Sequence, residues 1–189
     1  FQNNSLYRTG VAVGDYPVDH HHNAHPNYRE LPKLDFYPIP SYSIPLGSLM
    51  PENIKNFLVI EKSISVSNLV NGTTRLQPVV MQIGQAAGIL ASLAVSQNKL
   101  VDKVSIRDVQ LEILNNKGYI QPFIDVSYEN PNFISYQKIG ACGILKGEGM
   151  NIGWENKTLF YPENELSRTD LLEGLKDYYN LNHHPIPNL

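Results

Sequence analysis

The feature that most constrains the fold is the segment Ile64 to Val95, in which a polar stretch leads into a long apolar one. Pro78 suits the first turn of a helix, because its φ is fixed and its missing N–H costs no hydrogen bond there. Gly84 and Gly88, four residues apart, let such a helix approach another backbone closely. Apolar residues recur at helical spacing at Val79, Val80, Ile83, Ala86, Ala87, Leu90, Leu93 and Ala94. The pattern predicts a core helix that begins at Pro78.

The polar stretch before this helix, from Ser67 to Gln77, is predicted to be a loop with Gly72 at its turn. Arg75 is its only charged residue. A loop rich in hydroxyl groups that delivers a cation and a helix N-terminus suits an anionic or electron-rich group. A purely structural alternative stays open, because many helices begin with proline and bury glycine and alanine without any ligand.

Residues 56–95, and above all NGTTRLQPVVMQIGQAAG at 71–88, resemble the C-terminal FAD-contacting segment of a family of FAD-dependent oxidoreductases. The resemblance implies that Phe57–Ile60 is the last sheet strand and that the following helix points its N-terminus at the flavin. The family's Ala-Gly-Arg appears here as Ile60-Glu61-Lys62. Members are often labelled xanthan lyases, a name that the flavin-type residues do not support. The resemblance assigns cofactor binding to Lys62, Gly72, Thr73, Thr74, Arg75, Gln77 and Pro78.

A second block, Gly14 to His22, gathers groups suited to proton transfer. Histidine titrates near neutrality and acts as acid, base or metal ligand. In the same family a Gly-Ser-Tyr-x-x-Asp-x-His stretch lies on the substrate side of the flavin. The resemblance therefore assigns catalytic roles to Tyr16, Asp19 and His21, with Asp15 in place of the serine.

Two other interpretations of this block stay open, a solvated polar loop and a metal site made of His20, His22 and His25. We assign no metal ligand, because no acidic or cysteine partner lies at a familiar zinc spacing.

The 189 residues allow one or two domains. Residues 7–19 have a strand-type pattern, the proline-rich stretch after them is irregular, and Ser105 caps a helix that Gly118 stops. We predict an α/β fragment in residues 1–120, in which short strands, ordered loops and the Gly/Ala-rich helix would complete an FAD-binding domain. Residues 121–189 are predicted to form a separate, small α-helical hairpin module.

The second module resembles an S-layer homology domain. The resemblance rests on the frame from Phe123 to Asp125, the run Gly143 to Gly147, and Ser167 to Asp170 at the start of the second helix. It implies binding of a cell-wall polymer and favours export to the periplasm or the cell surface. A helical hairpin with a purely structural role is the alternative.

The Gly-x-Gly-x-x-Gly unit that holds the cofactor pyrophosphate does not occur in the sequence. We therefore expect a piece of a longer protein whose N-terminal FAD-binding half is its partner, and expect this piece alone to be empty and inactive. The expected reaction is hydride transfer from a small-molecule or saccharide substrate to FAD. The alternatives are a non-catalytic module that binds carbohydrate or cell-wall polymer, and a xanthan-type polysaccharide lyase that uses Tyr16, His21 and Arg75.

Composition excludes several other classes. The net charge of −3 comes without a basic run, which argues against a nucleic acid partner. The single cysteine, Cys142, excludes an internal disulfide and a cysteine-based metal cluster. The apolar run Ile83–Val95 is short and rich in glycine, so we expect no membrane span.

Overall fold

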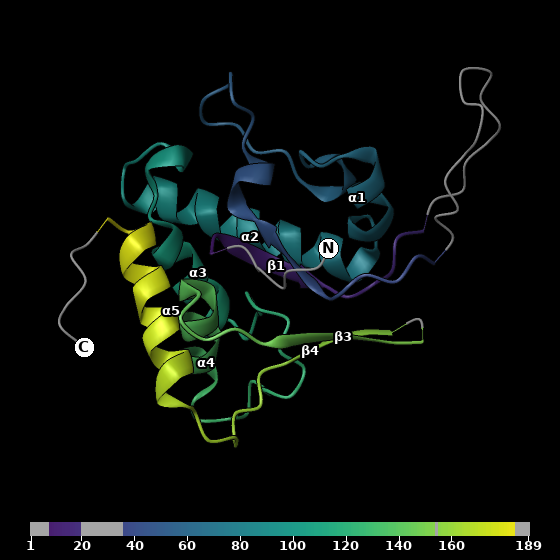
Figure 1. The fold of residues 1–189 in the computed structure, drawn as a ribbon. Helices are drawn as coiled ribbons and strands as arrows, with labels where there is room; N and C mark the ends of the chain where they lie inside the picture. The colour runs from purple at the N-terminus through teal and green to yellow at the C-terminus, as the bar shows by residue number, and fades with distance from the viewer. Residues whose placement is uncertain (1–7, 20–35, 154, 184–189) are drawn as a thin grey trace.

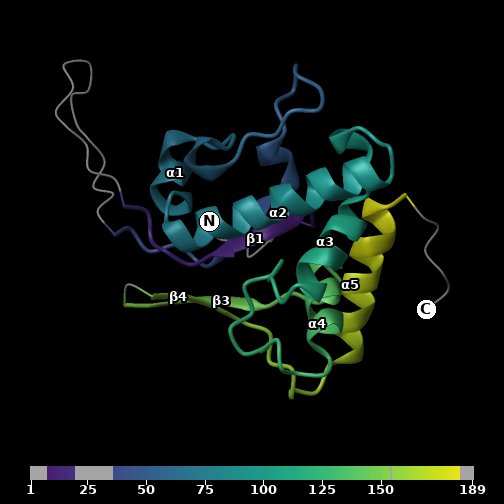
Figure 2. The same ribbon diagram turned by 180° about the vertical axis from the view of Figure 1, so that it is seen from behind.

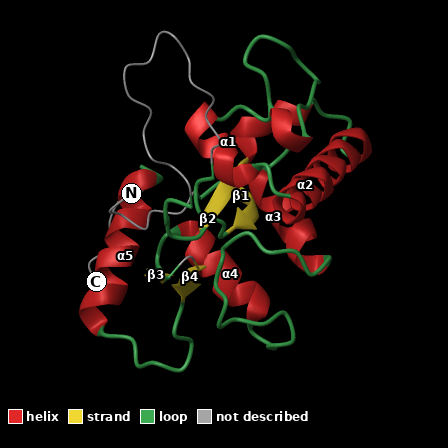
Figure 3. Ribbon diagram, turned by 90° about the vertical axis from the view of Figure 1, so that its right-hand side faces the viewer, coloured by secondary structure: helices red, strands yellow, loops and turns green. Residues whose placement is uncertain are grey.

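A computed structural model describes residues 8–19, 36–153 and 155–183, and the structural statements below concern these residues. They form a mixed α/β structure with five α-helices and two small antiparallel sheets (Figure 3). In chain order the strands and α-helices are β1 Gly10–Gly14, β2 Tyr42–Pro45, α1 Asn68–Thr74, α2 Gln77–Ser96, α3 Ile106–Asn115, α4 Phe133–Cys142, β3 Glu148–Ile152, β4 Glu155–Leu159 and α5 Arg168–Leu181. The 3₁₀ helices are η1 Leu46–Leu49, η2 Glu61–Ser63 and η3 Val101–Lys103.

The long helix α2 is the centre of the N-terminal part, as its sequence pattern predicts. Strands β1 and β2 pair in antiparallel fashion, and α2 packs against β1 with α3 beside it (Figure 1). The buried face of α2 consists of Val79, Ile83, Ala86, Ala87, Leu90 and Ala94. Each large apolar side chain buried in this way stabilises the fold by roughly 1.5–3 kcal/mol.

Helix α2 is also longer than the apolar run that we judged too short for a membrane span. Its 20 residues are long and apolar enough to cross a bilayer by length and composition alone, a property that core helices of soluble proteins share. That the chain has no membrane span therefore stays a prediction.

Two expectations for the segment before α2 are wrong. The predicted loop contains helix α1, because the Ser67 hydroxyl accepts from Val70 N at 3.2 Å and caps its first turn. Gly72 lies inside this helix. Phe57–Ile60 forms no strand: the segment is held to the fold by a hydrogen bond from Val59 N to Leu49 O, and its Phe57 side chain is 52% exposed. A strand needs a neighbouring strand, and the described residues place none beside it.

The helix predicted after Ser105 is confirmed as α3, and the Ser105 hydroxyl accepts from Arg107 N at 3.2 Å. The left-handed residue behind it is Lys117, at φ +60°, rather than Gly118. Gly118 N instead donates to Ile113 O at 2.8 Å and satisfies a carbonyl at the helix end.

The C-terminal region, residues 121–183, differs from a plain helical hairpin. Helices α4 and α5 form as predicted, and the Ser167 hydroxyl caps α5 by accepting from Asp170 N at 3.0 Å. Between them the chain forms the antiparallel β3–β4 hairpin, where a helical hairpin would have only a connecting turn. This β-hairpin lies beside the segment that follows β1 (Figures 1 and 2). Strand β4 also meets the start of the region, through a parallel bridge between Phe123 and Thr158.

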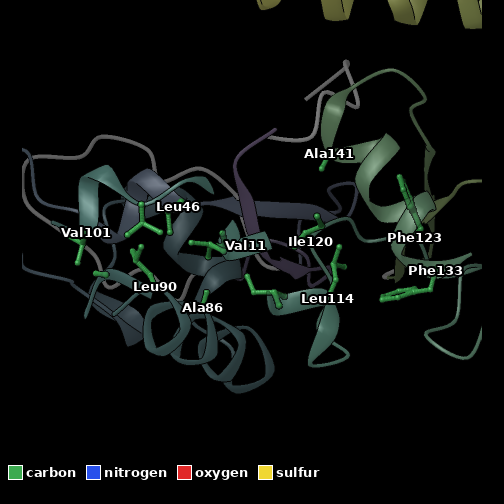
Figure 4. Packing of buried hydrophobic residues seen from close by; sticks show 14 of the residues in the cluster. Val11, Leu46, Ala86, Leu90, Val101, Leu114, Ile120, Phe123, Phe133 and Ala141 are labelled. Atoms are coloured by element: carbon green, nitrogen blue, oxygen red, sulfur yellow. The ribbon is translucent and has the colours of Figure 1, made fainter. Parts of the chain in front are cut away.

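A single apolar cluster runs from the N-terminal part into the C-terminal region (Figure 4). It begins at Leu46, Leu90 and Val11 around α2 and β1, and continues through Ile120 to Phe123 and Phe133. The division into 1–120 and 121–189 stays a prediction, and the two parts share a core.

Candidate functional site

Helix α1 contacts the segment that follows β1, residues 14–19, which we call the substrate-side segment. Thr73 Oγ1 donates to Tyr16 O at 2.5 Å and lies 2.8 Å from the Tyr42 hydroxyl. The Tyr42 hydroxyl in turn donates to Thr73 O at 3.0 Å. Three segments far apart in the chain therefore meet at one buried threonine.

The Tyr42 side chain reaches Thr73 because residue 14 is glycine. A Cβ at Gly14 would overlap the Tyr42 hydroxyl and ring. Burial raises the pKa of Tyr42 above its ordinary value, so the hydroxyl keeps its proton and remains a donor at neutral pH.

Arg75, at the end of α1, reaches the other end of the substrate-side segment. Its Nη2 donates to Asp19 O at 3.2 Å and lies 3.8 Å from Asp19 Oδ2. The Asp19 side chain is 12% exposed and that of Arg75 39% exposed. The cation is thus held at the surface by a nearly buried carboxylate.

The N-terminus of α2 lies one residue beyond Arg75. Its N-cap residue Leu76 supplies no side-chain hydrogen bond, and Gln77 and Pro78 are exposed. The free N–H groups of a long helix carry partial positive charge at this end. Together with Arg75 they form an exposed electropositive corner.

The comparisons with known proteins bear on this corner. A family model described as FAD dependent oxidoreductase matches residues 2–113, which is more than half of the chain. The chain belongs to the FAD-dependent oxidoreductase family. No curated protein and no solved structure matches it. The family match ends within α3 and leaves the C-terminal region of this oxidoreductase outside it.

The residues of this electropositive corner suit FAD as a ligand. Besides Arg75 and the uncapped helix, the Thr74 hydroxyl is buried and has no hydrogen-bond partner among the described residues. A buried hydroxyl without a partner is costly, and a polar ligand group would remove that cost. FAD binding is a property of the family, and the residues present here suit it.

Lys62 precedes α1 in the chain, whereas Arg75 follows it. The Lys62 carbonyl is hydrogen-bonded to a residue of that helix. Asn71 Nδ2 donates to Lys62 O at 3.0 Å, whereas the exposed Lys62 ammonium lies 3.6 Å from Glu61. Glu61, which stands where the family has glycine, adopts φ +66°. The backbone therefore keeps a left-handed conformation that glycine adopts without strain.

The structure brings four of the residues assigned from the sequence together: Tyr16, Asp19, Thr73 and Arg75. His21, like His20, His22 and His25 of the alternative metal site, lies outside the described residues. Among the residues that the structure describes, no group of three or more potential ligands could hold a metal ion.

Two residues of this neighbourhood were missed by sequence reasoning. Tyr42 lies in the proline-rich stretch, where no periodicity singles it out. The Gln82 side-chain amide accepts from Val13 N and donates to Val13 O, at 3.0 Å each. It therefore supplies hydrogen bonds to the edge of β1 that does not pair with β2. Gln82 could have been identified from the sequence as a polar residue on an otherwise apolar helix face.

Proposed function

We propose that this chain supplies the flavin-facing corner and the substrate-side segment of an oxidoreductase that transfers a hydride from a substrate carbon to FAD. The observation that carries the proposal is the contact between the two: Arg75 and Thr73, beside the α2 N-terminus, bind Asp19 and Tyr16. When bound, FAD supplies the hydride acceptor. The substrate class proposed from the resemblance is a small molecule or a saccharide.

The residues divide into two roles in this proposal. Arg75 and the N-terminus of α2 stabilise negative charge at the cofactor, because both direct positive charge into one exposed corner. The resemblance to the family adds Lys62, Gly72, Thr74, Gln77 and Pro78 to the residues proposed to bind FAD. Asp19 orients Arg75. Tyr16 and His21 keep the substrate-side roles that the resemblance assigns to them, with His21 as the proton acceptor.

The exposed face of α2 supports a partner, the N-terminal FAD-binding half of the same protein. Met81 is 74% exposed and Val95 83% exposed, although both lie on the core helix. A Cβ built at Gly84 or at Gly88 meets nothing within 4 Å. Small residues on an open apolar face permit close packing of another backbone, which suits a sheet that carries the Gly-x-Gly-x-x-Gly unit.

FAD binding tests the proposal directly. Purified residues 1–189 should be colourless and show no FAD-dependent shift in melting temperature, whereas the longer protein should carry the visible flavin band and be stabilised by FAD. Gly84→Leu in the longer protein should lower its flavin content, because the added side chain blocks the packing face. A longer protein that neither binds nor responds to FAD would overturn the proposal, and a yellow 1–189 chain would overturn the need for a partner.

Arg75→Ala should lower the flavin reduction potential of the longer protein. Loss of a cation beside the cofactor disfavours the reduced, more negative form, and a loss of about 1.4 kcal/mol corresponds to about 30 mV for a two-electron couple. Equilibration with a reference dye measures this without any substrate. Arg75→Lys should keep most of the potential, and Arg168→Ala on α5 is the control. A lower melting temperature with an unchanged potential would reduce Arg75 to a structural partner of Asp19.

The carbohydrate-binding and lyase alternatives, the resemblance of the C-terminal region to an S-layer homology domain, and the export that it favours rest on sequence alone. No contact among the described residues favours them over the flavin proposal.

A further inference from the structure

We propose that the β3–β4 hairpin positions the substrate-side segment, with Asn156 as the positioning residue. This proposal rests on the proposed function for its significance in the reaction, and on the hairpin contacts for its geometry. It gives the C-terminal region a role within this protein rather than in binding a polymer.

The Asn156 side chain is hydrogen-bonded to the main chain next to Tyr16. Its side chain is buried, with the residue 1% exposed, and its Nδ2 donates to Asp15 O at 2.6 Å. The next carbonyl, Tyr16 O, accepts from Thr73 Oγ1. The two peptide planes that flank the Tyr16 Cα are therefore fixed by two different partners, one from the C-terminal hairpin and one from helix α1.

A second contact from the same strand holds β2. The buried Thr158 hydroxyl is hydrogen-bonded to the buried Ser41 hydroxyl, and Ser41 precedes Tyr42. Thr158 O also accepts from Ile124 N at 3.0 Å, which ties β4 to the start of the C-terminal region. Strand β4 therefore reaches both segments that meet at Thr73.

The choice of side chain indicates positioning rather than simple packing. Asn156 Oδ1 is buried and has no hydrogen-bond partner among the described residues, a cost that a leucine at this position would avoid. What asparagine adds is the one donor to Asp15 O. On the paired strand the residue opposite, Asn151, is exposed and offers a matched control.

Hydrogen exchange of the 1–189 chain, measured by mass spectrometry, tests the proposal without any cofactor. With Asn156→Leu, the amides of Asp15, Tyr16, Val18 and Asp19 should exchange roughly 5- to 30-fold faster. The Val18 amide, which donates to Tyr37 O, is one of them. Asn151→Leu should leave them unchanged. Equal exchange in the two variants, or acceleration spread evenly over α2 and α5, would overturn the proposal.

Thr158 keeps the test decisive if Asn156→Leu fails to fold. Thr158→Val, which has nearly the same shape, should speed exchange around Ser41 and Tyr42, and Thr158→Ser should restore protection because it keeps the hydroxyl. Absence of this difference would contradict the proposal. FAD binding by the longer protein is a separate measurement, so failure of the flavin proposal and failure of the positioning proposal give different results.

Discussion

Gly174→Ala is expected to detach α5 and lower the free energy of unfolding by about 3 kcal/mol or more. Gly174 is the buried residue of α5, and a Cβ there would overlap the carbonyl oxygen of Ile144 and lie 2.8 Å from its carbonyl carbon. Both partners are backbone, so neither a rotamer change nor a side-chain shift relieves the overlap. For a chain of this size the melting temperature should fall by about 6–12 °C.

The matched control is Gly84→Ala, the same substitution inside another helix. A Cβ at Gly84 meets nothing within 4 Å, so alanine should stabilise the 1–189 chain by about 0.5–1 kcal/mol through its higher helix propensity. Urea unfolding of both variants gives the two values. If the two substitutions changed stability alike, α5 would not pack on Ile144 as described.

The sequence was informative where a local rule sets the structure. Helices α2 and α3 follow from apolar periodicity and, for α3, from the Ser105 cap, and β1 follows from its strand-type pattern. Each of these signals lies within the element that it predicts. Caps and periodicity act through neighbours in the chain, and therefore need no knowledge of the fold.

The errors arose where distant contacts decide. Ser67 is a good helix cap, but the glycine and two threonines that follow it lower the helix propensity of this segment. Helix α1 is also stabilised by hydrogen bonds between Thr73 and the distant residues Tyr16 and Tyr42. Phe57–Ile60 has strand composition and no neighbouring strand among the described residues. Where the sequence predicts only a helical hairpin, cross-strand pairing between β3 and β4 adds an extended β-hairpin.

The candidate site was predictable only in part, for the same reason. Arg75 and Asp19 are 56 residues apart, and no spacing rule connects them. The family resemblance assigned both, and the fold places them in contact. Tyr42 and Asn156 lie in segments without a motif, so only the folded chain reveals that both contribute to the surroundings of Tyr16.

Gln137→Leu is expected to disrupt the junction between the two predicted domains, with a loss of about 3–9 kcal/mol. Gln137 is fully buried, and its Oε1 accepts from Ile120 N at 3.0 Å and from Gln121 N at 2.8 Å. Its Nε2 donates to Gln121 O at 3.0 Å. Leucine would leave three buried backbone groups without partners, and each costs about 1–3 kcal/mol.

Gln137→Glu keeps most of this contact, because a carboxyl group at a fully buried position takes up a proton and can then accept from the N–H groups and donate to Gln121 O. It should therefore be less damaging than leucine, while Lys138→Leu, at the next and exposed position of α4, should change stability by less than about 0.5 kcal/mol.

Urea unfolding followed by circular dichroism and by exchange of α2 amides decides the domain question. If α2 stays protected while α4 and α5 unfold, residues 1–120 fold independently, as the sequence predicts. If both unfold together, the shared apolar cluster makes the chain one cooperative unit. A loss below about 1 kcal/mol for Gln137→Leu would mean that the buried amide does not hold Ile120 and Gln121 in place.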